Sequence, residues 1–155
     1  MTAIRIAKEF DLDIVIEHCT EGHLIADELA ELGISAVVGP SLSNRSKVEL
    51  KNLSFITPGV LAQKGVKVAI MTDHPVIPIQ YLPVCAALAV REGMKEEDAL
   101  AAITINAAEI LGISDRVGSL EKGKDADVVI WNGHPLDIKS KPSCVIINGE
   151  IVYKS

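Results

Sequence analysis

The hydrophobic positions in the first part of the chain follow two alternating patterns. Short apolar runs bounded by glycine, proline or polar residues predict strands at Asp13–His18, Ser35–Val38 and Val66–Met71. Apolar residues at helical spacing predict helices at Ala3–Phe10, Glu21–Leu32, a segment ending with Val60–Lys64, Tyr81–Glu92 and Lys95–Leu111. Strands that alternate with helices are typical of βαβ units, so we expect a parallel sheet. Three consecutive strands make an incomplete sheet with bare edges.

Two of the connecting segments carry further expectations. In the helix predicted at Glu21–Leu32, the apolar side chains expected to face the core are Leu24, Ile25, Ala26, Leu29 and Leu32. Gly33 is the expected C-cap of that helix. Ser41–Leu53 is predicted to be a polar loop with room for one helical turn.

The pattern changes at Ser114, where the helical spacing ends. Gly, Lys and Asp punctuate the following residues, and short apolar runs then predict strands at Val128–Trp131, Cys144–Ile147 and Ile151–Tyr153. Asn148-Gly149 separates the last two runs, and this dipeptide between apolar strands is a strong hairpin signal. We therefore expect an α/β unit over residues 1–113 and a small antiparallel β unit over residues 114–155.

Composition narrows the class of protein. Hydrophobic residues make up 48% of the 155 residues, enough for a sizeable core, and an aromatic content of 3% makes that core aliphatic. A net charge of −6 gives no electrostatic argument for binding nucleic acid or an anionic membrane. Three cysteines without a CxxC pair argue against a disulfide framework. There is no signal peptide and no apolar run of about 18 residues, so we expect a soluble, cytoplasmic protein.

The candidate chemistry lies where two predicted strands end. The run Val66–Pro75 (VKVAIMTDHP) ends on Asp73 and His74, and the first predicted strand ends on His18. Residues at the carboxyl ends of parallel strands converge on one edge, where an imidazole and a carboxylate can hold a divalent ion such as zinc. Two ligands are too few for a metal site. From the pattern alone, Asp73 equally suits a helix cap, with His74 on the rim and His18 a structural strand-end group.

Three neighbouring features have a functional and a structural interpretation. His23 starts the helix after His18 and is either a substrate contact or an ordinary cap or surface group. Cys19 is either a reactive thiol or a small buried hydrophobic residue. Asn44 and Arg45 follow the second predicted strand and either meet an anionic or carbonyl group or belong to a solvated loop.

Several motifs together resemble one known family. The segment RVGSLEKGKDADVVIWNGHPLD (Arg116–Asp137), followed by VIINGEIVY, is the most specific, and ITINAAEIL, IEHCTEGH and IMTDHP accompany it. The chain resembles the carboxyl-terminal part of a metal-dependent amidohydrolase of the imidazolonepropionase-like group. The resemblance implies the last three βα units of a TIM-type (β/α)8 barrel (strands 6–8) over residues 1–113, and part of a small β-sandwich domain over residues 114–155.

The resemblance also implies a site. His18 and Asp73 match the family's metal ligands, with Asp73 also accepting a proton from water, and zinc is the expected ion. We assign His23 a catalytic or substrate contact, and Asn44, Arg45 and His74 substrate contacts. The full-length relative would hydrolyse a C–N bond in a cyclic amide or a similar small molecule.

The chain also departs from the family pattern. The family's first-strand His-x-His pair, its fourth-strand ligand and its fifth-strand histidine have no counterpart in this sequence. We therefore expect a fragment or truncated homologue that has little or no activity unaided, and whose partner is either the missing N-terminal part or a second copy. The alternative is a non-catalytic module that self-associates through its exposed sheet edges.

Overall fold

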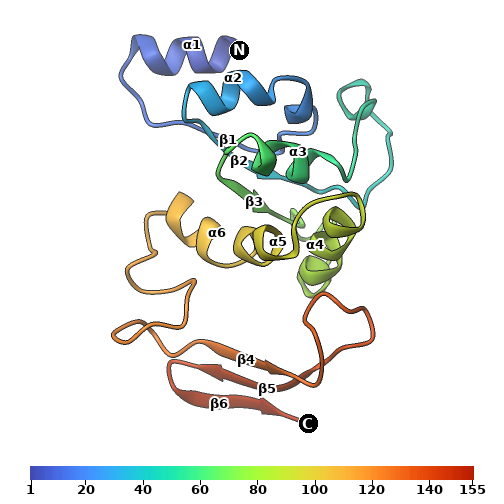
Figure 1. The fold of residues 1–155 in the computed structure, drawn as a ribbon, viewed down its shortest axis with the longest axis vertical. Coiled ribbons are helices and arrows are strands. Elements are labelled where there is room, and N and C mark those ends of the chain that lie inside the picture. Colours follow the sequence, from blue (N-terminus) through green and yellow to red (C-terminus); the bar gives the residue numbers. More distant parts are fainter.

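A three-stranded parallel sheet forms the centre of the first part of the molecule (Figure 1). The computed structural model describes residues 1–155. In their order across the sheet, the strands are β1 (Val15–Ile16), β2 (Ser35–Val38) and β3 (Val68–Ile70). Ala36 in β2 lies opposite Ile16 on one side and Val68 on the other. The parallel sheet predicted from the alternating pattern is therefore confirmed, with β1 shorter than expected.

Helices surround this sheet and separate it from the C-terminal strands. The α-helices are α1 (Thr2–Glu9), α2 (Ala26–Glu31), α3 (Thr57–Gln63), α4 (Leu82–Arg91), α5 (Glu96–Ala102) and α6 (Ile105–Ile110). Three short 3₁₀ turns are η1 (Gly22–Leu24), η2 (Val48–Leu50) and η3 (Ile79–Tyr81). In Figure 1, α1 and α2 lie on the side of the sheet nearest the N-terminus, and α4, α5 and α6 lie between this sheet and β4–β6. No helix is long and apolar enough to cross a membrane.

The helix predicted over Glu21–Leu32 is wrong in its first half. The chain makes the 3₁₀ turn η1 before α2 begins, and Ile25 between them has a non-helical φ of −131°. Gly22 packs closely against Cys19 in this turn, where a Cβ on residue 22 would lie 2.5 Å from the Cys19 sulfur. Leu24 consequently points outward and is 60% exposed, although the helical pattern predicted it to be buried.

The single helix predicted over Lys95–Leu111 is also wrong, because α5 and α6 are separate. Thr104 lies between them with φ −137° and ψ −99°, outside the helical region. Its hydroxyl donates a 2.7 Å hydrogen bond to the carbonyl of Leu100, four residues earlier, and such local bonds compete with regular helix structure. The interruption sets α6 against β3, beside α5.

The buried residues form two clusters on either side of β3. One joins α1, α2, β2 and α3, and includes the fully buried Leu29 and Leu61. The other joins β3 to α4 and α5, and consists largely of alanines such as Ala86, Ala99 and Ala102. Small side chains let these two helices approach each other and the sheet closely. Both clusters are free of aromatic side chains, as the composition predicted.

Each outer strand of the parallel sheet is paired on one side only, as expected for an incomplete sheet. The main chain of β3 at Lys67 and Met71 bonds to β2, so the Val68 carbonyl points to the opposite edge. Asn106 of α6 donates its side-chain amide to this carbonyl at 3.0 Å. A helix side chain thus supplies one of the hydrogen bonds that a neighbouring strand would otherwise make.

The last part of the chain is a three-stranded antiparallel sheet. Its strands, in order, are β4 (Val128–Trp131), β5 (Pro142–Ile147) and β6 (Glu150–Lys154). Asn148 and Gly149 join β5 to β6 with φ values of 51° and 81°, which is the pattern of a type I′ hairpin turn. The predicted hairpin is confirmed. We refer to residues 1–113 as the α/β unit and to residues 114–155 as the β unit.

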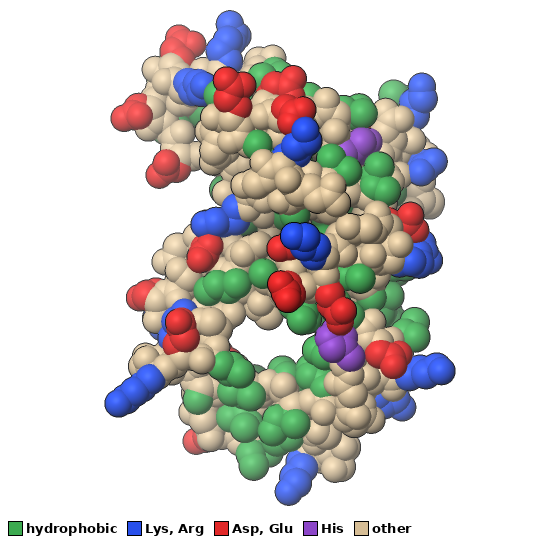
Figure 2. Space-filling view, in the orientation of Figure 1, with side chains coloured by type: hydrophobic (Ala, Val, Ile, Leu, Met, Phe, Trp, Pro, Cys, Tyr) green, Lys and Arg blue, Asp and Glu red, His purple; other side chains and the backbone are tan.

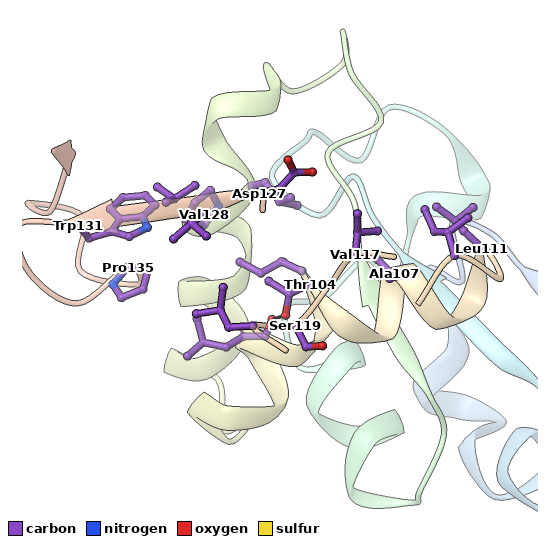
Figure 3. A pocket seen from close by; sticks show the side chains of 18 residues that line it. Thr104, Ala107, Leu111, Val117, Ser119, Asp127, Val128, Trp131 and Pro135 are labelled. Carbon is purple, nitrogen blue, oxygen red and sulfur yellow. Dashed lines mark hydrogen bonds between the residues drawn. The ribbon is translucent and has the colours of Figure 1, made fainter. Parts of the chain in front are cut away.

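A largely apolar cavity of about 610 Å³ separates the helices of the α/β unit from β4 (Figure 3). Figure 2 shows hydrophobic side chains gathered around the opening between the two units. Thr104, Ala107 and Leu111 line it from the helix side, and Val128 and Trp131 from the strand side. Beyond this cavity, Nε2 of His134 in the β unit lies 2.7 Å from a carboxylate oxygen of Glu96 at the start of α5.

We expect truncation of the fully buried Leu61 to destabilise the fold far more than truncation of Leu24. Leu61→Ala should lower the free energy of unfolding by about 2–5 kcal/mol, because it leaves a cavity in the first cluster. The exposed Leu24→Ala should change it by less than about 0.5 kcal/mol. Urea denaturation followed by circular dichroism measures both. Equal losses in the two variants would contradict this description of the core.

Candidate functional site

The residues that follow the three parallel strands lie at one edge of the sheet. Met71, just after β3, donates its backbone N–H to the carbonyl of Val38 at the end of β2, at 3.0 Å. Gly39, just after β2, contacts both neighbours: its N–H donates to the His18 carbonyl at 3.4 Å, and a Cβ on Gly39 would collide with the Met71 carbonyl oxygen. The chain segments carrying His18 and Asp73 therefore share this edge, which we call the carboxyl edge, two strand spacings or roughly 10 Å apart.

The His18 ring is oriented by the end of the neighbouring strand. Its Nδ1 lies 3.0 Å from the Gly39 carbonyl oxygen, which can only accept a hydrogen bond. The proton in this hydrogen bond is therefore on Nδ1, and Nε2 takes part in no hydrogen bond within the chain. Metal-binding histidines characteristically donate their second ring nitrogen to a carbonyl or carboxylate in this way.

Asp73 follows β3 and begins a turn in the segment that leads to η3. Its backbone carbonyl accepts a 2.8 Å hydrogen bond from the N–H of Val76, and the residue is half-buried. The alternative in which Asp73 caps a following helix is wrong, because η3 begins at Ile79 with Pro78 as its N-cap. His74 is exposed, beside Asp73.

Strained backbone marks the carboxyl edge. Asp73, His18 and Cys19 have φ values of 52°, 61° and 32°, in a region that side-chain-bearing residues rarely adopt. The other two non-glycine residues with positive φ, Asp11 and Asn148, lie after a helix and in a hairpin turn, where such values are common. Strain of this kind is typical of functional sites and costs about 1–3 kcal/mol for each residue.

His23 is held by a buried threonine. Its Nδ1 lies 2.8 Å from the hydroxyl oxygen of Thr57, the first residue of α3, which is fully buried. The Thr57 hydroxyl in turn donates to the carbonyl of Thr20 at 3.4 Å. With the threonine proton directed at Thr20, the hydroxyl oxygen accepts a hydrogen bond from Nδ1–H of His23. Sequence reasoning missed Thr57, which carries no pattern signal beyond its place before Pro58.

Cys19 is a buried side chain, as one of its two interpretations predicted. It is 7% exposed, and burial raises the pKa of its thiol above the usual value. Burial raises the pKa of Cys85 in the same way. Both thiols are therefore less reactive than a free cysteine at neutral pH.

Asn44 and Arg45 lie in an exposed loop that begins at the carboxyl edge. The Arg45 guanidinium donates a 2.7 Å hydrogen bond to the Leu53 carbonyl, which closes the loop on itself. Asn52 near its far end donates to the Glu21 carboxylate at 2.6 Å, close to His18 and His23 in the sequence. The predicted helical turn is present as η2.

The structure does not bring together a full set of metal ligands. No group of three or more His, Cys, Asp or Glu side chains is placed to hold a metal ion. The large cavity beside β4 is not the candidate site either, because Asp127 is its only charged lining residue and neither His18 nor Asp73 reaches it. Of the residues predicted for a site, His18, Asp73 and His74 follow strands at the carboxyl edge, and His23 lies in the turn η1 after His18.

Comparison with known proteins identifies the family. The model of the amidohydrolase family matches residues 7–152. An imidazolonepropionase of Cupriavidus necator is 36% identical over 121 residues, which is 75% of this chain and 27% of that enzyme. The crystal structure of an amidohydrolase from Thermotoga maritima MSB8 superposes with a TM-score of 0.95 at 52% identity, covering 99% of this chain and 40% of that one. An adenosine deaminase from Xanthomonas campestris, solved with bound zinc, gives a TM-score of 0.63 at 26% identity over 88% of this chain and 36% of that one.

The chain belongs to the amidohydrolase family, a family of hydrolases that generally use a divalent metal ion. The resemblance to imidazolonepropionase-like members is confirmed. The chain spans less than a third of the length of the imidazolonepropionases that it matches.

We expect Thr57→Val to change the protonation site of the His23 ring. Valine keeps the volume but removes the acceptor for Nδ1–H, so the proton should redistribute toward Nε2. Long-range ¹H–¹⁵N NMR correlations of the imidazole measure this directly. Thr2→Val, which removes an exposed hydroxyl elsewhere, is the control, and an unchanged His23 tautomer in Thr57→Val would refute the assignment.

Alkylation should distinguish the three cysteines. At pH 8 the raised pKa values of Cys19 and Cys85 keep less thiolate at these positions, and burial restricts access. The half-buried Cys144 should therefore react first with iodoacetamide, as mass spectrometry would report. Fast labelling of Cys19 in the folded chain would restore its interpretation as a reactive thiol.

Proposed function

We propose that this chain provides part of the active site of a metal-dependent hydrolase that cleaves C–N bonds in cyclic amides or similar small molecules. The observation that carries the proposal is that His18 and Asp73 both follow strands at the carboxyl edge, each with a positive φ. The Gly39 carbonyl orients the His18 ring. The relatives named imidazolonepropionase support the substrate class, because the imidazolone in that name is a cyclic amide.

The fold expected for the whole protein belongs to the same proposal. Residues 1–113 would form the last three βα units of a (β/α)8 barrel, and residues 114–155 part of its small β-sandwich domain. The bare outer edges of β1 and β3 support this interpretation, because neighbouring strands in a closed barrel would pair with them. The missing partner would be the N-terminal part of the same protein or a second chain.

The two candidate ligands suit a divalent ion such as zinc. His18 offers the free lone pair of Nε2, and Asp73 offers a carboxylate that accepts no side-chain hydrogen bond from the rest of the chain. An ion bound there would polarise a substrate carbonyl and make water a stronger nucleophile at neutral pH. Since catalytic zinc sites use three protein ligands, further ligands have to come from outside this chain.

The chain's own residues would then handle protons and orient the substrate. Asp73 would accept a proton from the attacking water and deliver it to the leaving nitrogen, as a general base and then a general acid. His23, with Nε2 unprotonated, would accept a hydrogen bond from the substrate, held in place by Thr57. His74, exposed next to Asp73, and Asn44 would add substrate contacts at the rim.

Zinc titration of the isolated chain tests the ligand assignment. We expect Zn²⁺ to shift the ring resonances of His18 and the amide of Asp73 in NMR spectra, with weak affinity because only two ligands are present. His18→Ala should abolish the shift, whereas His134→Gln in the β unit should not. A zinc response centred on another histidine would contradict the assignment.

The same zinc-loaded chain should not accelerate hydrolysis of a cyclic amide such as dihydrouracil above the rate with Zn²⁺ alone. The absent ligands leave the ion free to exchange and the substrate without a closed pocket. Turnover at enzyme-like rates would show that the chain is a complete enzyme and would refute the expected inactivity.

A second candidate function is self-association without catalysis, favoured by one feature of the β unit. Strand β6 is an edge strand with all five residues exposed, among them Ile151, Val152 and Tyr153. Exposed apolar edge strands readily pair with other chains. Size-exclusion chromatography with light scattering and metal analysis separates the candidates: a metal-free homodimer that ignores added Zn²⁺ favours self-association.

A further inference from the structure

The cavity between the two units is framed by the chain itself. Helices α4, α5 and α6 form one wall and β4 forms the opposite wall, and the segment from Val117 to Leu120 closes one side. On another side, Pro135 lines the cavity next to the contact between His134 and Glu96. Figure 2 shows the opening ringed by side chains. A small molecule can enter such a frame, whereas a helix or strand of another protein would have to displace one of its sides.

The size and lining of the cavity are those of a small-molecule pocket. Its volume of about 610 Å³ lies within the range of about 300–1,000 Å³ that such sites occupy. Of its 18 lining residues, 12 are hydrophobic, and they come from both walls. Leu111 and Leu120 in this lining are 71% and 80% exposed. Apolar surface therefore stays in contact with water there, and a ligand that covered it would gain hydrophobic stabilisation.

The polar side chains of the lining are already engaged within the chain. Thr104 donates its hydroxyl to a backbone carbonyl at 2.7 Å. The Ser119 hydroxyl is hydrogen-bonded to both Glu121 and Lys124 at 2.6 Å. Asp127 is the only charged lining residue, and one of its oxygens accepts a backbone N–H at 2.9 Å. An anionic ligand would find no cationic partner in this lining, and burying its charge would be costly.

Trp131 is the one lining side chain with an unused hydrogen-bond donor. It is the only tryptophan of the chain, and it is half-buried at the end of β4. Its indole N–H donates no hydrogen bond within the chain and is open to solvent. Pro135 lies beside it in the lining (Figure 3). An aromatic ring with a free N–H suits an apolar compound that carries one acceptor oxygen.

We propose that this cavity binds an uncharged, largely apolar small molecule with one carbonyl or ether oxygen. The hydrocarbon part of the ligand covers the apolar side chains of the two walls, and its oxygen accepts the indole N–H of Trp131. The site goes beyond the proposed hydrolase function, because neither His18 nor Asp73 lines it and no metal takes part. A ligand that contacts both walls also ties the α/β unit to the β unit.

Three compounds of similar shape and different charge test the site in the metal-free 155-residue chain. Cyclohexyl methyl ketone, cyclohexanecarboxylate and cyclohexylmethylammonium are titrated at pH 7 and constant ionic strength. The single indole N–H signal, that of Trp131, is followed by ¹H–¹⁵N NMR. We expect the ketone to shift this signal saturably with millimolar affinity, and the two ions to bind at least about tenfold more weakly. No saturable shift with the ketone, or equal or tighter binding of either ion, would overturn the proposal.

Cavity-filling variants separate binding in the cavity from binding elsewhere on the surface. Ala107→Phe introduces a ring from α6, and Val129→Phe introduces one from the opposite wall, so the test does not depend on the folding of one variant. Each should abolish the saturable response to the ketone, whereas Ala3→Phe on the exposed surface of α1 should leave it unchanged. Circular dichroism checks that the variants fold. Unchanged ketone affinity in the folded filling variants would place the ligand outside the cavity and overturn the proposal.

Trp131→Phe tests the hydrogen bond to the ligand. Phenylalanine keeps an aromatic ring in the lining and removes the N–H donor. Binding of the ketone, followed through the ligand's own NMR signals, should weaken by about threefold to tenfold, the usual range for one hydrogen bond. Unchanged affinity would reject the acceptor oxygen as a requirement of the site. Zinc titration reports on His18 and Asp73 in separate samples, so this proposal and the proposed function fail independently.

Discussion

The candidate site depends on the close approach of three strand ends around Gly39. Its carbonyl oxygen accepts the hydrogen bond from the His18 ring, and its bare Cα leaves room for the Met71 carbonyl. Any side chain at this position would clash with the Met71 carbonyl and shift the backbone that holds the acceptor for His18. The direction of the His18 imidazole and the close approach of the second and third strand ends therefore depend on one residue that has no side chain.

Two other parts of the structure follow from the same arrangement. The connection that leaves Gly39 becomes the exposed loop that carries Asn44 and Arg45, and the hydrogen bond from Asn52 to Glu21 brings this loop back beside η1. In that turn, the His23 ring is held by its hydrogen bond to the hydroxyl of Thr57 at the start of α3. His18, His23 and Asp73 thus lie on connections that are far apart in the sequence but leave the sheet at the same carboxyl edge.

The order and type of most elements could be predicted because apolar periodicity and turn residues agree with the fold. The β5–β6 hairpin follows from Asn148-Gly149, and β2 was predicted residue for residue. The failures come from contacts between residues three or four apart, which the spacing of apolar positions does not record. The Cys19–Gly22 packing shortens α2 to its second half, and the Thr104 hydroxyl divides the last helical segment in two. At the site, the strand-end positions of His18 and Asp73 were accessible from the pattern. The roles of Gly39 and Thr57 were not, because they depend on partners more than 20 residues away.

The side-chain amide of Asn106 affects how a further strand could pair with the outer edge of β3. This amide already donates a hydrogen bond to the Val68 carbonyl, which is at the beginning of β3. The backbone groups of Ile70, at the other end of the strand, have no such partner on the outer edge of β3. A further strand beside β3 would therefore compete with the Asn106 amide at Val68 and would find the groups at Ile70 open. Helix α6 thus makes pairing at one end of β3 less favourable than at the other.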